Sequence, residues 1–128
     1  MFGRMLPEQM LARVYASVGH ILRSSQTALL AAEPDLEGRL GGAAVEYRVV
    51  YHAWPGPGER VEMRSGHREL TPKLRRVIHW LLDPSSGRPW ATAEMVSLFL
   101  DLKARRSLTL SEHGLKAMGI EAIPDLKL

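Results

Sequence analysis

Glu8 is the residue whose type and position best suit acid–base chemistry. It follows Pro7 at the start of a long segment of helical apolar periodicity, where the first turn of a helix leaves backbone N–H groups unpaired. A carboxylate can activate an attacking group, and the N–H groups of Gly3, Arg4 and Met5 could stabilise an oxyanion. The alternative is that Glu8 only complements the helix dipole, as acidic residues in a first turn often do.

Ser17 and His20 stand three positions apart on the polar face of the same segment, a spacing that permits a hydrogen bond. They could form a nucleophile and its base, although no acidic residue between Glu8 and Glu33 would orient the imidazole. A polar face turned toward solvent or a partner subunit is the other interpretation. Arg13 lies on this face too, and we treat Arg13, Ser17 and His20 as candidate substrate contacts.

Lys73, Arg75 and Arg76 form a basic group that could meet a phosphate-bearing ligand, or could be a solvated turn and strand face. The chain has no cysteine, which removes disulfides and thiolate metal sites. His52, His67 and His79 do not have metal-ligand spacing, so we interpret them as strand-face or core residues. We predict no metal and no cofactor.

The elements that must position these residues follow from changes in periodicity. Apolar positions repeat at helical spacing from Pro7 to about Ala32, and Glu33-Pro34 ends the pattern. A loop rich in glycine and acidic residues, 34–42, comes next. Alternating or apolar runs bounded by proline and glycine then predict strands at residues 45–51, 61–69, 74–82 and 90–100, and a short helix begins near Ser111.

The order of one helix followed by successive strands predicts an α+β fold in a single domain of residues 1–128. Because one long helix can bury its apolar stripe only against the sheet, we expect a curved antiparallel sheet of about four strands to wrap it. The mostly apolar last strand is expected to lie centrally. A cone-shaped fold of the nuclear-transport-factor type is the competing architecture, which normally has more than one N-terminal helix.

Composition restricts location and partners. Apolar residues make up 45% of the chain and charged residues 24%, the balance of a globular protein. No run of eighteen apolar residues and no signal-peptide pattern is present, so we expect a cytoplasmic protein without membrane contact. The net charge of +3 is too small to indicate nucleic-acid binding.

Three segments resemble the hotdog-fold acyl-CoA thioesterase superfamily, of the 4-hydroxybenzoyl-CoA thioesterase type. Residues 3–14 resemble its passage from the first strand into the helix, with Arg4 where the family often has histidine. Residues 47–62, with Pro57-Gly58-Glu59, resemble its strand, Pro-Gly-Asp turn and next strand. Residues 91–102 resemble its last strand. In this comparison the family's first strand and its usual acid would precede Met1.

The resemblance implies hydrolysis of an acyl-CoA or acyl-carrier thioester, with Glu8 as base and the oxyanion held at the helix N-terminus. It also implies a homodimer or tetramer with acyl-CoA sites at the seam, and nucleotide phosphates bound by Arg48, Lys73, Arg75 and Arg76. Because the usual carboxylates are missing, a non-catalytic hotdog module that binds acyl groups or assembles with partners is the alternative.

Overall fold

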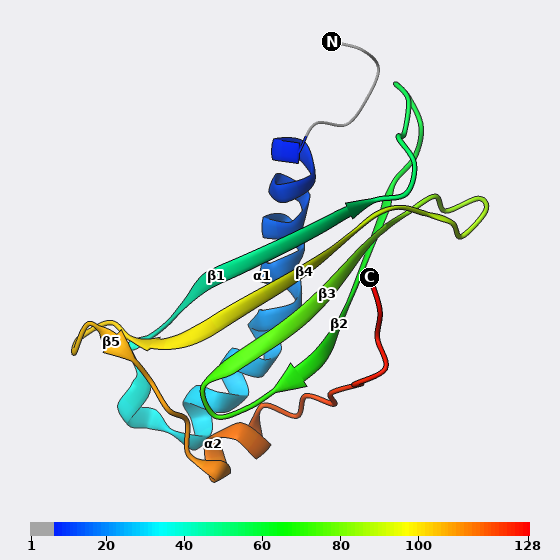
Figure 1. Cartoon of the computed structure of the whole chain (residues 1–128). Coiled ribbons are helices and arrows are strands. Elements are labelled where there is room, and N and C mark those ends of the chain that lie inside the picture. The colour runs from blue at the N-terminus through cyan, green and yellow to red at the C-terminus, as the bar shows by residue number, and fades with distance from the viewer. Residues whose placement is uncertain (1–6) are drawn as a thin grey trace.

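A long helix, α1 (Pro7–Ala32), lies across one face of an antiparallel sheet (Figure 1). The computed structural model describes residues 7–128, except for the side chains at positions 7, 8, 10, 11, 15 and 17–22 within α1. The bounds of α1 are those that the apolar periodicity predicts. Pro34 ends the helix because its ring clashes with a preceding helical turn, and the chain continues as a 3-10 turn, η1 (Pro34–Leu36).

The sheet has four long strands in the order β1-β4-β3-β2, and all neighbouring strands are antiparallel. The predicted number of strands and their antiparallel character are therefore confirmed. A two-residue strand that the sequence did not predict pairs with the end of β4. The bounds are β1 (Leu40–Tyr51), β2 (Glu62–Leu70), β3 (Leu74–Leu82), β4 (Pro89–Asp101) and β5 (Arg106–Ser107).

The start of β1 corrects one prediction. The sequence predicts that residues 40–42 belong to the glycine-rich loop 34–42, but Leu40 pairs with Asp101 and Gly42 pairs with Phe99. Glycine is a weak strand former, so local preference gives no sign of this pairing. The long apolar strand β4 supplies the partner groups that extend β1, and a β-bulge follows between Ala44 and Glu46.

Strand β4 lies between β1 and β3, which confirms its predicted central position. Every residue from Ala91 to Ser97 is buried. The face of the sheet toward α1 is apolar at one end, where Val14 of the helix packs with Leu81, Ala91 and Ala93. Val14 thus buries part of the apolar stripe of α1 against the sheet.

A second apolar cluster joins the far end of α1 to the C-terminal region. Leu29 and Phe99 pack with Leu110 and Met118, which flank a short helix, α2 (Glu112–Ala117). The hydroxyl of Ser111 caps α2 by accepting a hydrogen bond from the Gly114 N–H. None of the helices in residues 7–128 combines the length and apolar content that crossing a bilayer requires.

Candidate functional site: a cavity between helix and sheet

Strand alternation divides the predicted basic group between the two faces of the sheet. In β3, Arg75 shares a face with Val77 and Leu81 and points toward α1, whereas Arg76 lies on the opposite, outer face. Lys73 is exposed in the turn before β3. The three cations therefore do not form one surface, and the prediction of a shared phosphate site for them is not met by this geometry.

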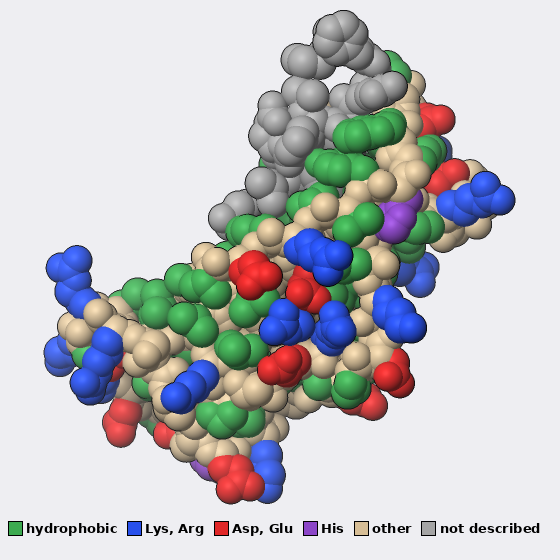
Figure 2. Space-filling model, viewed as in Figure 1, with side chains coloured by type: hydrophobic (Ala, Val, Ile, Leu, Met, Phe, Trp, Pro, Cys, Tyr) green, Lys and Arg blue, Asp and Glu red, His purple; other side chains and the backbone are tan. Residues whose placement is uncertain are grey.

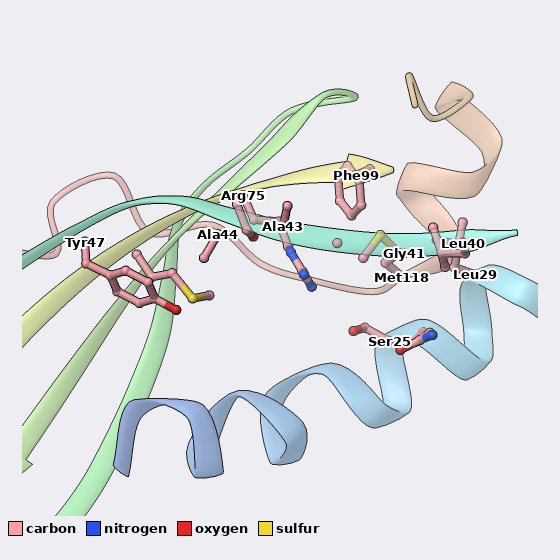
Figure 3. A pocket seen from close by; sticks show the side chains of 14 residues that line it. Ser25, Leu29, Leu40, Gly41, Ala43, Ala44, Tyr47, Arg75, Phe99 and Met118 are labelled. Atoms are coloured by element: carbon pink, nitrogen blue, oxygen red, sulfur yellow. The ribbon is translucent and has the colours of Figure 1, made fainter. Parts of the chain in front are cut away.

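A cavity of about 230 Å³ opens between the last turns of α1 and the strands β1, β3 and β4 (Figure 3). Apolar side chains form much of its wall, and Arg75, Ser97, Tyr47 and Ser25 are among the polar ones. The lining residues are Ser25, Gln26, Leu29, Leu40, Gly41, Gly42, Ala43, Ala44, Tyr47, Arg75, Met95, Ser97, Phe99 and Met118.

Arg75 is the dominant charge of this cavity. Only 7% of the residue is exposed, and its guanidinium lies over the Phe99 ring, 5.2 Å from the ring centroid. Burial lowers the pKa of Arg75 from its ordinary value to about 10, because removing the cation from water disfavours the charged form. The side chain nevertheless remains protonated at neutral pH, so the cavity carries a positive charge.

The polar groups near Arg75 are neutral. His67 lies on the same face in β2, and its pKa is lowered by burial and by the charge of Arg75. The Ser97 hydroxyl is buried and has no hydrogen-bond partner among the described residues. Gly42 of β1 leaves open the space beside the guanidinium, since a Cβ built there would stand 3.8 Å from Arg75 Nη2.

The outer face of the sheet carries an ion-pair network instead of a cavity. Glu94 of β4 accepts hydrogen bonds from Arg68 and from Arg76, each at 2.9 Å. Arg48 is exposed and pairs in register with Glu94 across β1 and β4. Figure 2 shows acidic and basic side chains intermixed over this face, so the local charge is largely compensated.

Most of the predicted catalytic positions fall outside the described part of the chain. These are Gly3, Arg4 and Met5, together with the side chains of Glu8, Ser17 and His20. Arg13 is described and is exposed on α1. At 1.5 Å rise per residue, the backbone of Glu8 lies about 25 Å along the helix from Ser25. The predicted base and the Arg75 cavity thus belong to opposite ends of α1.

The histidines are placed as strand-face and core residues. His79 is fully buried in β3, and its Nδ1 lies 2.6 Å from the Ser65 hydroxyl. Burial, together with nearby His67, lowers the pKa of His79 to about 4, so it is neutral. His52 lies just beyond β1 and contacts the Thr92 hydroxyl at 3.1 Å. No cluster of three metal-ligating side chains occurs within the described residues.

The sequence did not predict the cavity, because adjacent positions suggested that Arg75 and Arg76 belong to one basic surface. One signal was available: residues 75, 77, 79 and 81 alternate with 74, 76, 78 and 80, so adjacent arginines must point to opposite faces of a strand. Which face the helix covers depends on long-range packing, and the glycine-rich start of β1, which lines the cavity, was assigned to a loop.

No protein-family model and no curated protein sequence matches the chain. Solved structures do match it, and they establish a hotdog fold, as the sequence resemblance implied. The structure of YbaW, a probable thioesterase from Escherichia coli, has a TM-score of 0.78 at 14% identity, covering 92% of this chain and 86% of that one.

Two further structures show the same arrangement of elements. SAV2348 from Staphylococcus aureus, solved in complex with CoA, has a TM-score of 0.76 at 14% identity over 100% of this chain and 80% of that one. Slr0204, a 1,4-dihydroxy-2-naphthoyl-CoA thioesterase from Synechocystis, has a TM-score of 0.70 at 15% identity over 91% and 84%. Thioesterases are thus among the proteins that share this fold.

Proposed function

We propose that this protein is a cytoplasmic thioester hydrolase that acts on acyl-CoA or acyl-carrier substrates. The observation that carries the proposal is a hotdog fold shared with thioesterases. The Arg75 cavity lies at the opposite end of α1 from Glu8, so we do not place the reacting thioester in it.

In the proposed reaction, water adds to the thioester carbonyl while Glu8 accepts its proton. Backbone N–H groups around Gly3, Arg4 and Met5, before the N-terminus of α1, stabilise the oxyanion of the tetrahedral intermediate. Collapse of that intermediate breaks the carbon–sulfur bond, and the departing thiolate takes up a proton. The exposed cations Arg48 and Lys73 remain candidates for the nucleotide phosphates.

A homodimer, or a tetramer built from dimers, is part of the proposal. Strand β1 lies at one edge of the sheet, and Val45 at its bulge is 56% exposed. An exposed edge strand has unpaired backbone groups that a second copy can satisfy. Sedimentation analysis would test this expectation, and a monomer at micromolar concentration would contradict it.

Hydrolysis of acyl-CoAs of several chain lengths by the wild type, Glu8→Gln and Glu37→Gln tests the activity. The first substitution removes the proposed base, and we expect kcat to fall at least about 100-fold. Glu37 is an exposed residue following η1, so its variant is the matched control and should retain activity. Wild-type activity in Glu8→Gln would exclude Glu8 as the base.

One observation favours the second candidate, a hotdog module that binds acyl groups without chemistry. None of the described residues that line the cavity is acidic, and the sequence of α1 contains no acid after Glu8. If acyl-CoAs bind to the wild type but none is hydrolysed, the binding module is the correct assignment. Turnover that Glu8→Gln abolishes would exclude it.

A further inference from the structure

Arg75 is a buried cation that the described part of the chain does not neutralise. The ion pairs among the described residues join Arg39 to Asp101, Arg64 to Glu62, Arg68 and Arg76 to Glu94, Arg76 to Glu69, and Lys116 to Glu112. Arg75 takes part in none of these, and its Nε has no hydrogen-bond partner among the described side chains and backbone groups. Buried charges are normally paired because desolvation is unfavourable, so a buried arginine without an ion pair is unusual.

The helix side of the cavity cannot supply the missing anion. Positions 9–32 of the sequence contain neither aspartate nor glutamate. The contact with the Phe99 ring offsets only part of the lost hydration, since a cation–π interaction contributes about 2 kcal/mol when desolvated. The guanidinium therefore retains donors available to a group that enters from outside.

Space for such a group adjoins the guanidinium. A Cβ at Gly42 would lie 3.8 Å from Arg75 Nη2 and 3.7 Å from the Leu98 carbonyl oxygen, which are ordinary contact distances. Glycine leaves this volume open. Ser97, which is 4% exposed, lines the same cavity, and its hydroxyl has no hydrogen-bond partner in the described part of the chain. In Figure 3 the Arg75 side chain reaches from the sheet toward α1.

The chemistry of the walls narrows the ligand to a carboxylate on an aliphatic body. A guanidinium presents two parallel N–H donors that match the two oxygens of a carboxylate. One cation balances one negative charge, which favours a carboxylate over a doubly charged phosphate. Leu29, Leu40 and Met95 form apolar wall around it, and the volume of about 230 Å³ suits a short chain.

We propose that the cavity between α1 and the sheet binds a short aliphatic ligand that ends in a carboxylate. Arg75 forms an ion pair with this carboxylate, and the Ser97 hydroxyl contacts it. The source that we propose is a free short-chain carboxylic acid, which requires no catalytic activity. A short dicarboxylic acyl thioester does not fit, because with its distal carboxylate on Arg75 the thioester carbonyl would lie far from Glu8 at the other end of α1.

Binding is tested first, by calorimetric titration of the full chain with pentanoate and with pentan-1-ol. We expect pentanoate to bind the wild type at least tenfold more tightly than the alcohol does. Arg75→Met should remove that advantage. Arg75→Lys keeps the positive charge but lacks the two parallel N–H donors of the guanidinium, so its affinity for pentanoate should lie between those of the wild type and Arg75→Met. The exposed Arg64 on β2 supplies the control Arg64→Met, which should bind like the wild type.

A second variant tests the space without changing charge. Gly42→Val places a β-branched side chain, which strands favour, beside the guanidinium. The φ angle of Gly42 is not positive, so the substitution adds no backbone strain. We expect it to weaken pentanoate binding at least tenfold while circular dichroism and thermal melting show a folded protein.

The titrations decide the carboxylate site independently of hydrolysis, because they require no turnover at Glu8. Pentanoate affinity that falls in Arg75→Met and in Gly42→Val, but not in Arg64→Met, supports the free acid as the ligand. The proposal is overturned if pentanoate affinity does not depend on Arg75.

Discussion

Replacing Arg75 with methionine should stabilise the protein, although it removes a charged side chain from the core. Burial lowers the pKa of Arg75 from its ordinary value to about 10. Each pKa unit corresponds to about 1.36 kcal/mol, so holding this cation in the fold costs roughly 3 kcal/mol. Methionine keeps a flexible stem of similar length in contact with the cavity walls and loses the desolvated cation–π contact, about 2 kcal/mol.

The net expectation is a gain of about 1 kcal/mol in the free energy of unfolding. A chain of 128 residues has an unfolding entropy of about 270 cal/mol/K, so this gain raises Tm by about 4 °C. Thermal melting and urea unfolding of ligand-free wild type and Arg75→Met at pH 7 would measure it. A carboxylate ligand should stabilise the wild type, because it binds the folded form, and should therefore reduce the difference in Tm between the wild type and Arg75→Met.

The pH dependence has a definite sign. Below about pH 10, Arg75 is protonated in both the folded and the unfolded chain, so the full advantage of Arg75→Met is present. Above about pH 10 the folded wild type releases the proton before the unfolded chain does, and the stability of the wild type rises relative to that of the variant. The difference in Tm should therefore shrink as the pH is raised toward 11.

The neighbouring Arg76 provides the matched contrast. Its Nη1 donates to Glu94 at 2.9 Å and its Nε donates to Glu69 at 3.4 Å on the outer face. Arg76→Met should therefore destabilise the protein, on the order of 1 kcal/mol. A loss of stability in Arg75→Met equal to that in Arg76→Met would refute the reasoning, because it would mean that Arg75 is already paired within the protein.

Three further substitutions test the fold. The side chain of Arg39 and the N–H groups after Asp101 hold the pKa of that carboxyl at about 2, so Asp101→Asn should lower Tm at neutral pH. Thermal melts should show the difference disappearing as the pH falls from about 4 to 2, and a constant difference would contradict this role. Leu81 is fully buried, so Leu81→Ala should cost about 2–5 kcal/mol in urea unfolding, and a loss below 1 kcal/mol would show that the site collapses. A Cβ at Gly114 would lie 2.9 Å from Leu29 Cδ1, so Gly114→Ala should destabilise by about 1–3 kcal/mol, and an unchanged Tm would contradict that contact.

Local chemistry in the sequence determined the individual elements. The apolar stripe with Pro7 and Pro34 at its ends predicted α1, because helix bounds depend on nearby residues. The breaks at Pro72 and at Pro84-Ser85-Ser86-Gly87 predicted β3 in full, since proline and glycine there exclude continued strand pairing. The catalytic roles of Glu8, Gly3, Arg4 and Met5 remain predictions, and they too are argued from neighbouring residues in the sequence.

Tertiary structure alone decided how these elements meet. Strand β1 pairs with β4, whose residues lie about 40–60 positions away, and this pairing makes Leu40 to Gly42 part of the sheet and of the cavity wall. Alternation in β3 separates Arg75 from Arg76, but only the packing of α1 determines which arginine is buried. The physical reason is that periodicity acts over a few residues, whereas burial is set by contacts between segments distant in sequence.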